Sequence, residues 1–307
     1  MPNALHAFLS SSRPYLTDGG LETTLIFHDG FDLPLFAAFV LYDTPEGRAA
    51  LVRYFTRYLD VADADGRGFL LDTATWRANA GWGPKLGVSD VGLRSINRRA
   101  VELAADLRKS RGKTHPILIN GCIGPAGDGY RAEDLLPAER AETLHRPQIE
   151  ALADAGADMA TALTLTHTGE AIGLAWAATG VGLPIALSFT VETDGRLPDG
   201  TPLGEAIDAV EAETHGSPVY YGINCAHPTH FLDRLQGDWT ARIGLVRANA
   251  SRMSHAELDE AAQLDDGNPD EFGALYRLLA EKLPSLRALG GCCGTDHRHV
   301  SAVTQHQ

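Results

Sequence analysis

Short apolar segments alternate with longer amphipathic segments along nearly the whole chain. Eight short segments are rich in Ile, Leu, Val, Tyr and small apolar residues, a composition typical of buried strands. They span residues 15–17, 69–71, 117–119, 159–163, 185–188, 219–223, 243–246 and 286–289. Between them, apolar residues recur at helical spacing in 44–65, 89–110, 137–155, 170–180 and 255–283, the last interrupted by an acidic insert near 265–269.

Eight strands that alternate with helices predict an α/β protein with the architecture of a (β/α)8 TIM barrel. The 307 residues are enough for one such barrel, and no linker interrupts the pattern, so we expect a single domain over 1–307. A doubly wound nucleotide-binding sheet fits less well, because no Gly-x-Gly-x-x-Gly motif opens a helix.

Three of the four cysteines lie where strand-like segments end. Cys225 ends Gly222-Ile-Asn-Cys, and Cys292 and Cys293 lie in Gly290-Gly-Cys-Cys-Gly-Thr. Since barrel active sites form at the carboxyl ends of the strands, we expect all three side chains at one rim. Thiolates favour zinc, and three protein ligands with a fourth position open are typical of a catalytic zinc. The alternative, cysteines that pack as small apolar residues, does not require the flanking glycines.

Other polar and aromatic residues are expected at the same rim. Asp18 follows the first predicted strand, and Asp72 and Thr73 follow the second. Trp76 and Trp82 come soon after them, and aromatic faces can contact a cationic ligand, although packing beneath the loops explains them equally well.

Taken together, three motifs resemble the homocysteine S-methyltransferase family over residues 15 to 300 or so. They are Asp18-Gly-Gly-Leu-Glu-Thr, Gly222-Ile-Asn-Cys-Ala-His-Pro and Gly290-Gly-Cys-Cys-Gly-Thr. The resemblance implies a (β/α)8 barrel in which Cys225, Cys292 and Cys293 hold Zn²⁺ and act in catalysis. It also implies that the Asp18-Gly19-Gly20 turn binds substrate. Asp72, Thr73 and Trp76 are expected to bind substrate because of their position at the rim, although the family usually has Glu-Thr-Asn-Thr where this chain has Asp72-Thr73-Ala74-Thr75.

The sequence departs from the family pattern after the fourth predicted strand. Leu163-Thr164 stand where the family has a Glu-Thr pair that receives the ammonium group of homocysteine, and a leucine cannot do this. Two explanations remain open: another acidic residue, such as Glu192 or Asp72, takes over this role, or the acceptor is a thiol without an α-amino group.

Cys122 and four histidines near the motifs are given structural roles. Cys122 follows the third predicted strand and is expected to be a core residue. We expect His227, His230, His297 and His299 to form helix caps or loop contacts rather than to ligate the metal.

Charge counting indicates which reaction such a site would support. Three thiolates on zinc give a formal charge of −1, so a fourth thiolate from a substrate stays electron-rich, and the anionic site attracts a cationic donor. The predicted function is therefore methyl transfer from a sulfonium or quaternary ammonium donor to a small thiol. From the resemblance, the acceptor is homocysteine, the product is methionine, and the function lies in methionine biosynthesis. A zinc hydrolase, an enzyme with a different thiol acceptor, and a thiol- or metal-binding protein without turnover are the alternatives.

Composition adds limits on partners and location. A formal charge of −14 argues against nucleic acid as a partner. No apolar run reaches the roughly 18 residues of a membrane span, and the N-terminus lacks the features of a signal peptide. Four cysteines do not suggest a disulfide framework, so we expect reduced thiols and a cytoplasmic protein. Barrels of this family are often homo-oligomers, but no apolar stripe in the sequence identifies an interface.

Overall fold

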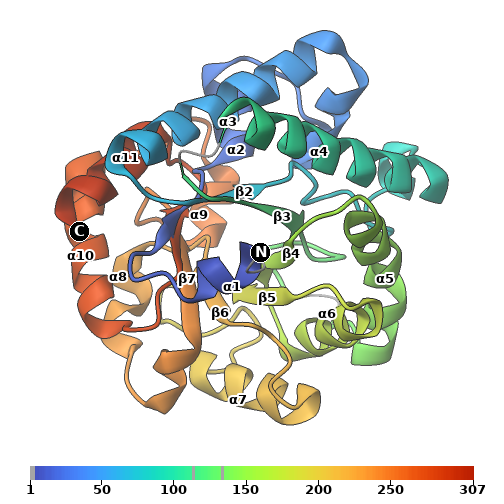
Figure 1. Ribbon diagram of the computed structural model, residues 1–307. Coiled ribbons are helices and arrows are strands. Elements are labelled where there is room, and N and C mark those ends of the chain that lie inside the picture. Colours follow the sequence, from blue (N-terminus) through green and yellow to red (C-terminus); the bar gives the residue numbers. More distant parts are fainter. Residues whose placement is uncertain (1–3, 113–114, 133–134) are drawn as a thin grey trace.

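Eight parallel strands close into one barrel in the order in which they occur along the chain. The computed structural model describes residues 4–112, 115–132 and 135–307, and Figure 1 looks along the barrel. The strands are β1 (Tyr15–Leu16), β2 (Phe69–Asp72), β3 (Ile117–Ile123), β4 (Met159–Leu165), β5 (Ile185–Phe189), β6 (Tyr221–Asn224), β7 (Ile243–Ala248) and β8 (Ala288–Gly291). The predicted (β/α)8 architecture is confirmed, and each predicted strand overlaps an observed one.

Helices surround the barrel and connect its strands (Figure 1). They are α1 (Ala4–Leu9), α2 (Leu21–Thr23), α3 (Pro45–Asp65), α4 (Asp90–Ser110), α5 (Ala138–Asp154), α6 (Thr168–Val181), α7 (Leu203–Thr214), α8 (Pro228–Phe231), α9 (His255–Glu260), α10 (Pro269–Lys282) and α11 (His297–His306). The helical pattern predicted over 255–283 is two helices, α9 and α10, because the acidic insert separates them.

The bounds of α3 follow from local sequence signals. The side chain of Thr44 accepts a hydrogen bond from the backbone N–H of Gly47 at 3.0 Å, and Pro45 occupies the first helical position. The helix ends at Gly66, whose φ of 70° is a left-handed conformation that glycine adopts without strain. These signals fix both ends of the helix that connects β1 with β2.

The apolar core has two layers. The larger layer lies between the strands and the surrounding helices, and a smaller one fills the barrel interior. Phe8 of α1 belongs to the interior layer and packs edge-on against Tyr15 and Tyr220. Helix α1 therefore closes the mouth at the amino ends of the strands and leaves the opposite mouth for the site.

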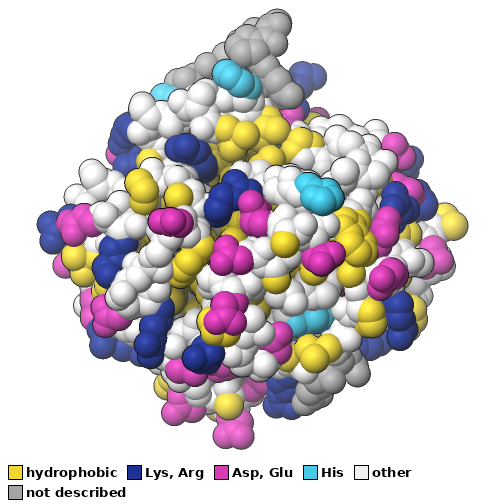
Figure 2. Space-filling view, turned by 90° about the horizontal axis from the view of Figure 1, so that it is seen from below, with side chains coloured by type: hydrophobic (Ala, Val, Ile, Leu, Met, Phe, Trp, Pro, Cys, Tyr) yellow, Lys and Arg dark blue, Asp and Glu magenta, His cyan; other side chains and the backbone are white. Residues whose placement is uncertain are grey.

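The surface is mixed in character on the face shown in Figure 2. Acidic, basic and hydrophobic side chains are interspersed there rather than gathered into one continuous patch. Among the described residues, none of the helices combines the length and apolar character needed to cross a membrane.

Helices α5 and α6 approach most closely at a glycine, which gives a test of their packing. A Cβ atom added at Gly173 would lie 2.5 Å from Cβ of Ala141 and 2.6 Å from the backbone nitrogen of Glu142. We expect Gly173→Ala to lower the free energy of unfolding by about 2 kcal/mol, because the two helices must move apart. Urea denaturation measures this change.

Gly180 near the end of the same helix provides the matched control. The three atoms nearest to a Cβ there all belong to the guanidinium of Arg146, the closest at 2.8 Å, and this group is the far end of a flexible side chain. We expect Gly180→Ala to be neutral or to stabilise by about 0.5 kcal/mol, because alanine is the better helix former. Equal losses at both glycines would contradict the close-packing explanation.

Candidate active site

The three cysteines predicted to share a site come together at the carboxyl rim of the barrel. Cys225 follows β6, and Cys292 and Cys293 follow β8, so that only β7 separates them in the sheet. Their three sulfur atoms lie within 4.8 Å of one another, and they are the group of His, Cys, Asp and Glu side chains in the described part of the chain that could hold a metal ion. The convergence predicted from the sequence is confirmed.

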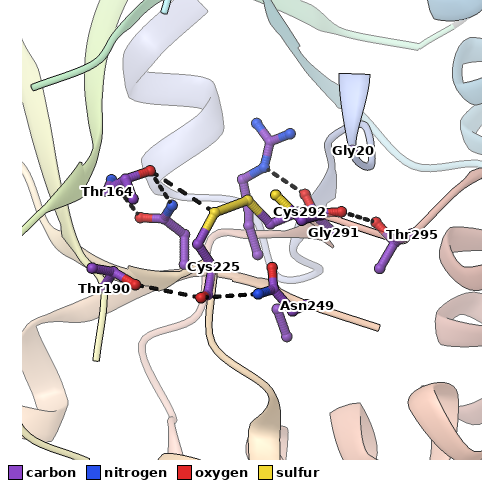
Figure 3. Close-up of a disulfide and its surroundings, with 12 residues drawn as sticks. Gly20, Thr164, Thr190, Cys225, Asn249, Gly291, Cys292 and Thr295 are labelled. Carbon is purple, nitrogen blue, oxygen red and sulfur yellow. Dashed lines mark hydrogen bonds between the residues drawn. A yellow bond between two sulfur atoms is a disulfide. The ribbon is translucent and has the colours of Figure 1, made fainter. Parts of the chain in front are cut away.

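Two of these cysteines are joined in the structure, which corrects one prediction. Cys225 and Cys292 form a disulfide with their Cα atoms 5.4 Å apart, whereas Cys293 is a free thiol (Figure 3). The expectation that all cysteines are reduced is wrong for this pair. The physical reason is that the arrangement that gathers three thiols for a metal also brings two of them within bonding distance.

The donor set fits a metal ion once that disulfide is reduced. Thiolates that bind one zinc ion at about 2.3 Å lie roughly 3.8 Å apart, which agrees with sulfur atoms that all lie within 4.8 Å of one another. Three thiolates also leave the fourth position of a tetrahedral ion for a substrate.

Backbone contacts hold Cys225 in place. The residue has a φ of 55°, a left-handed conformation that is uncommon for a side chain other than glycine or asparagine. Its N–H donates to the carbonyl of Arg247 at 3.1 Å, and its carbonyl accepts from the Asn249 side chain at 3.0 Å (Figure 3). The ring of His255 also contacts this carbonyl, through Nε2 at 2.8 Å. The strained turn aims the sulfur across the rim toward β8.

Tyr130 is a site residue that the sequence analysis missed. Its hydroxyl group donates a hydrogen bond to Sγ of Cys293 at 3.3 Å, and its ring stacks on that of His255 with centroids 4.2 Å apart. Burial raises the pKa of the Cys293 thiol, with the hydrogen bond from Tyr130 acting in the opposite direction. Tyr130 lies in the loop after β3, and nothing in the sequence there distinguishes it from an ordinary loop residue.

A cavity of about 330 Å³ lies at this rim. Its lining includes the three cysteines and all six residues predicted to bind substrate, which are Asp18, Gly19, Gly20, Asp72, Thr73 and Trp76. It also includes the acidic residues Glu22, Asp128 and Asp259, and burial raises the pKa of Glu22 to about 7. The predicted residues therefore share one cavity with the sulfur atoms.

A buried arginine, also missed from the sequence, joins the two acidic residues on the cavity floor. Arg247 of β7 forms ion pairs with Asp18, at 2.6 Å, and with Asp72. Asp18 also accepts from the hydroxyl group of Tyr54 at 2.9 Å, and Asp72 accepts from the Asn120 amide at 2.6 Å. Although burial opposes its charged form, Asp18 and Asp72 raise the pKa of Arg247. Burial raises the pKa of Asp72 to about 6, while Arg247 counteracts this effect.

Leu163 stands where the resemblance leads one to expect a glutamate, and both acidic residues named as possible substitutes already have partners. Leu163 lines the cavity and belongs to the apolar layer inside the barrel. The carboxylate of Glu192, one proposed substitute, contacts Nδ1 of His255 at 3.0 Å and is not part of the cavity lining. The other, Asp72, is paired with Arg247. Both carboxylates already have partners in the protein.

The two tryptophans near the rim contact a cation that belongs to the chain itself. The guanidinium carbon of Arg77 lies 3.9 Å from the ring centroid of Trp76 and 3.5 Å from that of Trp82. Trp76 lines the cavity, whereas Trp82 does not. The aromatic pair thus positions Arg77 at the cavity wall.

The remaining sequence predictions concern residues beside the site. Cys122 is buried and lies outside the metal-binding group, as expected of a core residue. His227 accepts a hydrogen bond from the N–H of Thr229 and caps α8, and His299 takes part in the capping box of α11. The role predicted for these two histidines is confirmed.

Comparisons with known proteins agree with this arrangement. The sequence model described as homocysteine S-methyltransferase matches residues 15–306. A homocysteine S-methyltransferase of Escherichia coli (strain K12) is 30% identical over 324 residues, covering 98% of this chain and 97% of that protein. A selenocysteine Se-methyltransferase of Brassica oleracea var. italica is 28% identical over 315 residues, covering 94% of this chain and 87% of that protein.

A solved structure also matches over the full length. The oxidized form of the homocysteine methyltransferase MmuM from Escherichia coli aligns with a TM-score of 0.76 and 26% identity, covering 99% of this chain and 100% of that chain.

The ion pairs of Arg247 can be tested by its removal. We expect Arg247→Met to lower the free energy of unfolding by about 3–5 kcal/mol at neutral pH, because two buried carboxylates would lose their cation. The control is Arg98→Met, which removes an exposed pair with Glu102 and should cost less than about 1 kcal/mol. Urea denaturation measures both changes.

The loss in free energy of unfolding caused by Arg247→Met should be smaller at about pH 5 than at about pH 8. Without the arginine, the pKa of Asp72, already raised to about 6, would rise further. A carboxyl group with a higher pKa in the folded state takes up a proton on folding, so its contribution is present at low pH and is lost as pH rises through the folded pKa. A loss that does not change with pH would contradict the assigned ion pairs.

Proposed function

This chain belongs to the homocysteine S-methyltransferase family, and we propose that it moves a methyl group from an activated donor to homocysteine, giving methionine. The proposal specifies a donor whose methyl group is carried by a sulfonium or a quaternary ammonium centre. The observation that carries it is the convergence of Cys225, Cys292 and Cys293 on one cavity at the carboxyl rim of the barrel. Residues 1–307 would act as one catalytic domain.

The three cysteines in their reduced form would hold a zinc ion. Their all-sulfur donor set supports zinc over magnesium or calcium, which prefer oxygen ligands. When bound, the zinc would supply a Lewis acid that keeps the acceptor thiol ionised at neutral pH. Because the Cys225–Cys292 disulfide must be open for this, the proposal places the working enzyme in a reducing compartment such as the cytoplasm.

The chain's own residues would orient the two substrates and shield the reaction from water. Asp18, Gly19 and Gly20 form one side of the substrate cavity, and Asp72 with Thr73 forms its floor. Trp76 would provide an apolar wall beside the transferred methyl group. The hydroxyl group of Tyr130 would keep its hydrogen bond to Cys293 and so fix that side chain while the acceptor enters.

The transfer itself needs little acid or base catalysis. A lone pair of the acceptor sulfur forms the new S–CH₃ bond, and the electron pair of the breaking bond goes to the donor's sulfur or nitrogen, which departs neutral. Negative charge from Asp128 and Asp259 around the cavity would attract the cationic donor. A hydrolase is less well supported, because metal-bound water gains little from an anionic thiolate shell.

Methionine formation tests the proposal directly. Reduced, zinc-loaded protein would be incubated with homocysteine and, in turn, S-methylmethionine, S-adenosylmethionine or betaine. We expect methionine with at least one donor and none when homocysteine is omitted. If no donor yields methionine while an ester or amide is hydrolysed without any thiol, the methyltransferase assignment is wrong.

Metal binding gives a second test, independent of turnover. We expect reduced protein to bind about one equivalent of zinc and the disulfide form to bind far less, as measured with a chromogenic chelator. Cys225→Ser, Cys292→Ser and Cys293→Ser should each weaken zinc binding by at least about 100-fold. Cys122→Ser, which changes a buried cysteine outside the group, serves as the control and should bind zinc normally. Normal zinc affinity in all three ligand variants would refute the site.

A further inference from the structure

Two residues of opposite charge line the cavity without an ion-pair partner in the described part of the chain. Arg77 follows β2, and Glu22 lies in the short helix α2 after β1. Both border the cavity that contains the three sulfur atoms. Among the described residues, none places a carboxylate within ion-pair distance of Arg77 or a cationic nitrogen within that distance of Glu22.

The guanidinium of Arg77 has both faces covered, but N–H donors at its edge remain free to bind a ligand. Its side chain is nearly fully buried, at 7% exposure, and the indoles of Trp76 and Trp82 stack on the guanidinium. Nη1 donates to the carbonyl of Gly127 at 3.0 Å, whereas the buried Nε has no acceptor among the described residues. A desolvated guanidinium with its faces covered and donors unused at its edge is suited to a carboxylate, which it can bind through two parallel hydrogen bonds.

Glu22 is fixed to the loop that carries two of the cysteines. The N–H of Gly20 donates to the carbonyl of Thr295 at 3.0 Å, and the N–H of Gly294 donates to the Thr23 hydroxyl at 3.2 Å. These bonds join α2 to the Cys292–Cys293 loop on both sides of Glu22. No side chain in the described part of the chain donates a hydrogen bond to the Glu22 carboxylate, which therefore remains available to a ligand.

The other acidic groups near the cavity floor are already engaged. Asp18 and Asp72 share the guanidinium of Arg247, and Glu192 contacts His255 outside the cavity. Three further acidic residues of the lining also have partners: Asp128 accepts from the N–H of Tyr130 at 2.7 Å, Asp259 pairs with Arg131 at 3.6 Å, and Asp265 accepts from the hydroxyl of Ser251 at 2.6 Å. Leu163 carries no charge.

We propose that Glu22 receives the α-ammonium group and Arg77 the α-carboxylate of the acceptor, which is a zwitterionic amino acid with a thiol side chain. This inference rests on the proposed function and names the residues that select its acceptor. The acceptor rather than the donor is assigned here because Glu22 is tied to the cysteine loop, beside which the acceptor sulfur would be held. The site thus recognises an amino acid although it lacks the glutamate on β4.

Three thiols with different charged groups allow the contact of Glu22 and that of Arg77 to be tested separately. Homocysteine carries both charged groups, 4-mercaptobutanoate lacks the ammonium, and 3-aminopropane-1-thiol lacks the carboxylate. The measurements are the dissociation constant of each thiol with reduced, zinc-loaded protein by calorimetry, and kcat/KM with whichever donor is active.

The expected pattern crosses over between the variants. Arg77→Met should weaken the binding of homocysteine and 4-mercaptobutanoate about 30- to 100-fold, while the affinity for 3-aminopropane-1-thiol should change by less than about threefold. Glu22→Gln should weaken the binding of homocysteine and 3-aminopropane-1-thiol by a similar factor and leave the affinity for 4-mercaptobutanoate nearly unchanged. Arg77→Lys keeps the positive charge but loses the planar pair of N–H donors. Its affinities for homocysteine and 4-mercaptobutanoate should therefore lie between those of the wild type and of Arg77→Met.

The matched control is Lys85→Met. Lys85 places its ammonium 4.1 Å from the ring centroid of Trp82 but does not line the cavity, so its loss should change none of the three affinities. Thermal unfolding monitors the fold. Arg77→Met loses its hydrogen bond to Gly127 and its stacking on the two indoles, so affinities are compared only at temperatures well below the melting temperature of each variant.

Three results would overturn the inference. Equal weakening of all three thiols by either variant would indicate a structural role. An effect confined to the KM of the donor would show that Glu22 and Arg77 contact the donor instead. If the wild-type protein bound 4-mercaptobutanoate more tightly than homocysteine, a binding site for the ammonium group would be excluded. Failure of the proposed function looks different: the crossed pattern of dissociation constants would persist without turnover of any thiol.

Discussion

Closure of the parallel barrel is the constraint on which the rest of the structure depends. It makes β6 and β8 the two neighbours of β7, so that cysteines 67 residues apart in the sequence have Cα atoms 5.4 Å apart. Because all eight strands run in the same direction, their carboxyl ends supply one rim, and α1 closes the other mouth. The same proximity allows two outcomes, a Cys225–Cys292 disulfide or a shared metal ion, and the redox state decides between them.

The strand between the cysteines determines the charge of the cavity. Arg247 of β7 reaches Asp18 after β1 and Asp72 at the end of β2, so one guanidinium links three parts of the barrel floor. The three charged groups are therefore paired with one another inside the protein rather than with a ligand. The ionic groups left for a ligand are on the wall, on Glu22 and Arg77, while the sulfur atoms provide the reactive end. The groups that would bind the substrate's charges and the sulfur atoms that would take part in the reaction thus lie at different places in one cavity.

Much of this could be predicted from the sequence. Strand and helix periodicity gave the fold, and cysteines at strand ends gave the sulfur cluster, because in a parallel barrel the position along a strand determines the rim. Arg247, Tyr130 and Arg77 could not be found in this way. Arg247 and Tyr130 act through partners distant in sequence, Asp18 and Cys293 respectively. Arg77 stacks on its neighbour Trp76, but its residue type alone does not show that its guanidinium borders the cavity. The disulfide was missed because composition reports the number of cysteines and not how closely two of them approach.

Zinc K-edge X-ray absorption tests the central claim, that Cys225, Cys292 and Cys293 hold one ion with a position open to a thiol. For reduced, zinc-loaded protein, the account predicts three sulfur neighbours at about 2.3 Å and one lighter neighbour. On addition of homocysteine, the sulfur count should rise to four at the same distance. Fewer than three sulfur neighbours, or a spectrum that homocysteine leaves unchanged, would contradict it.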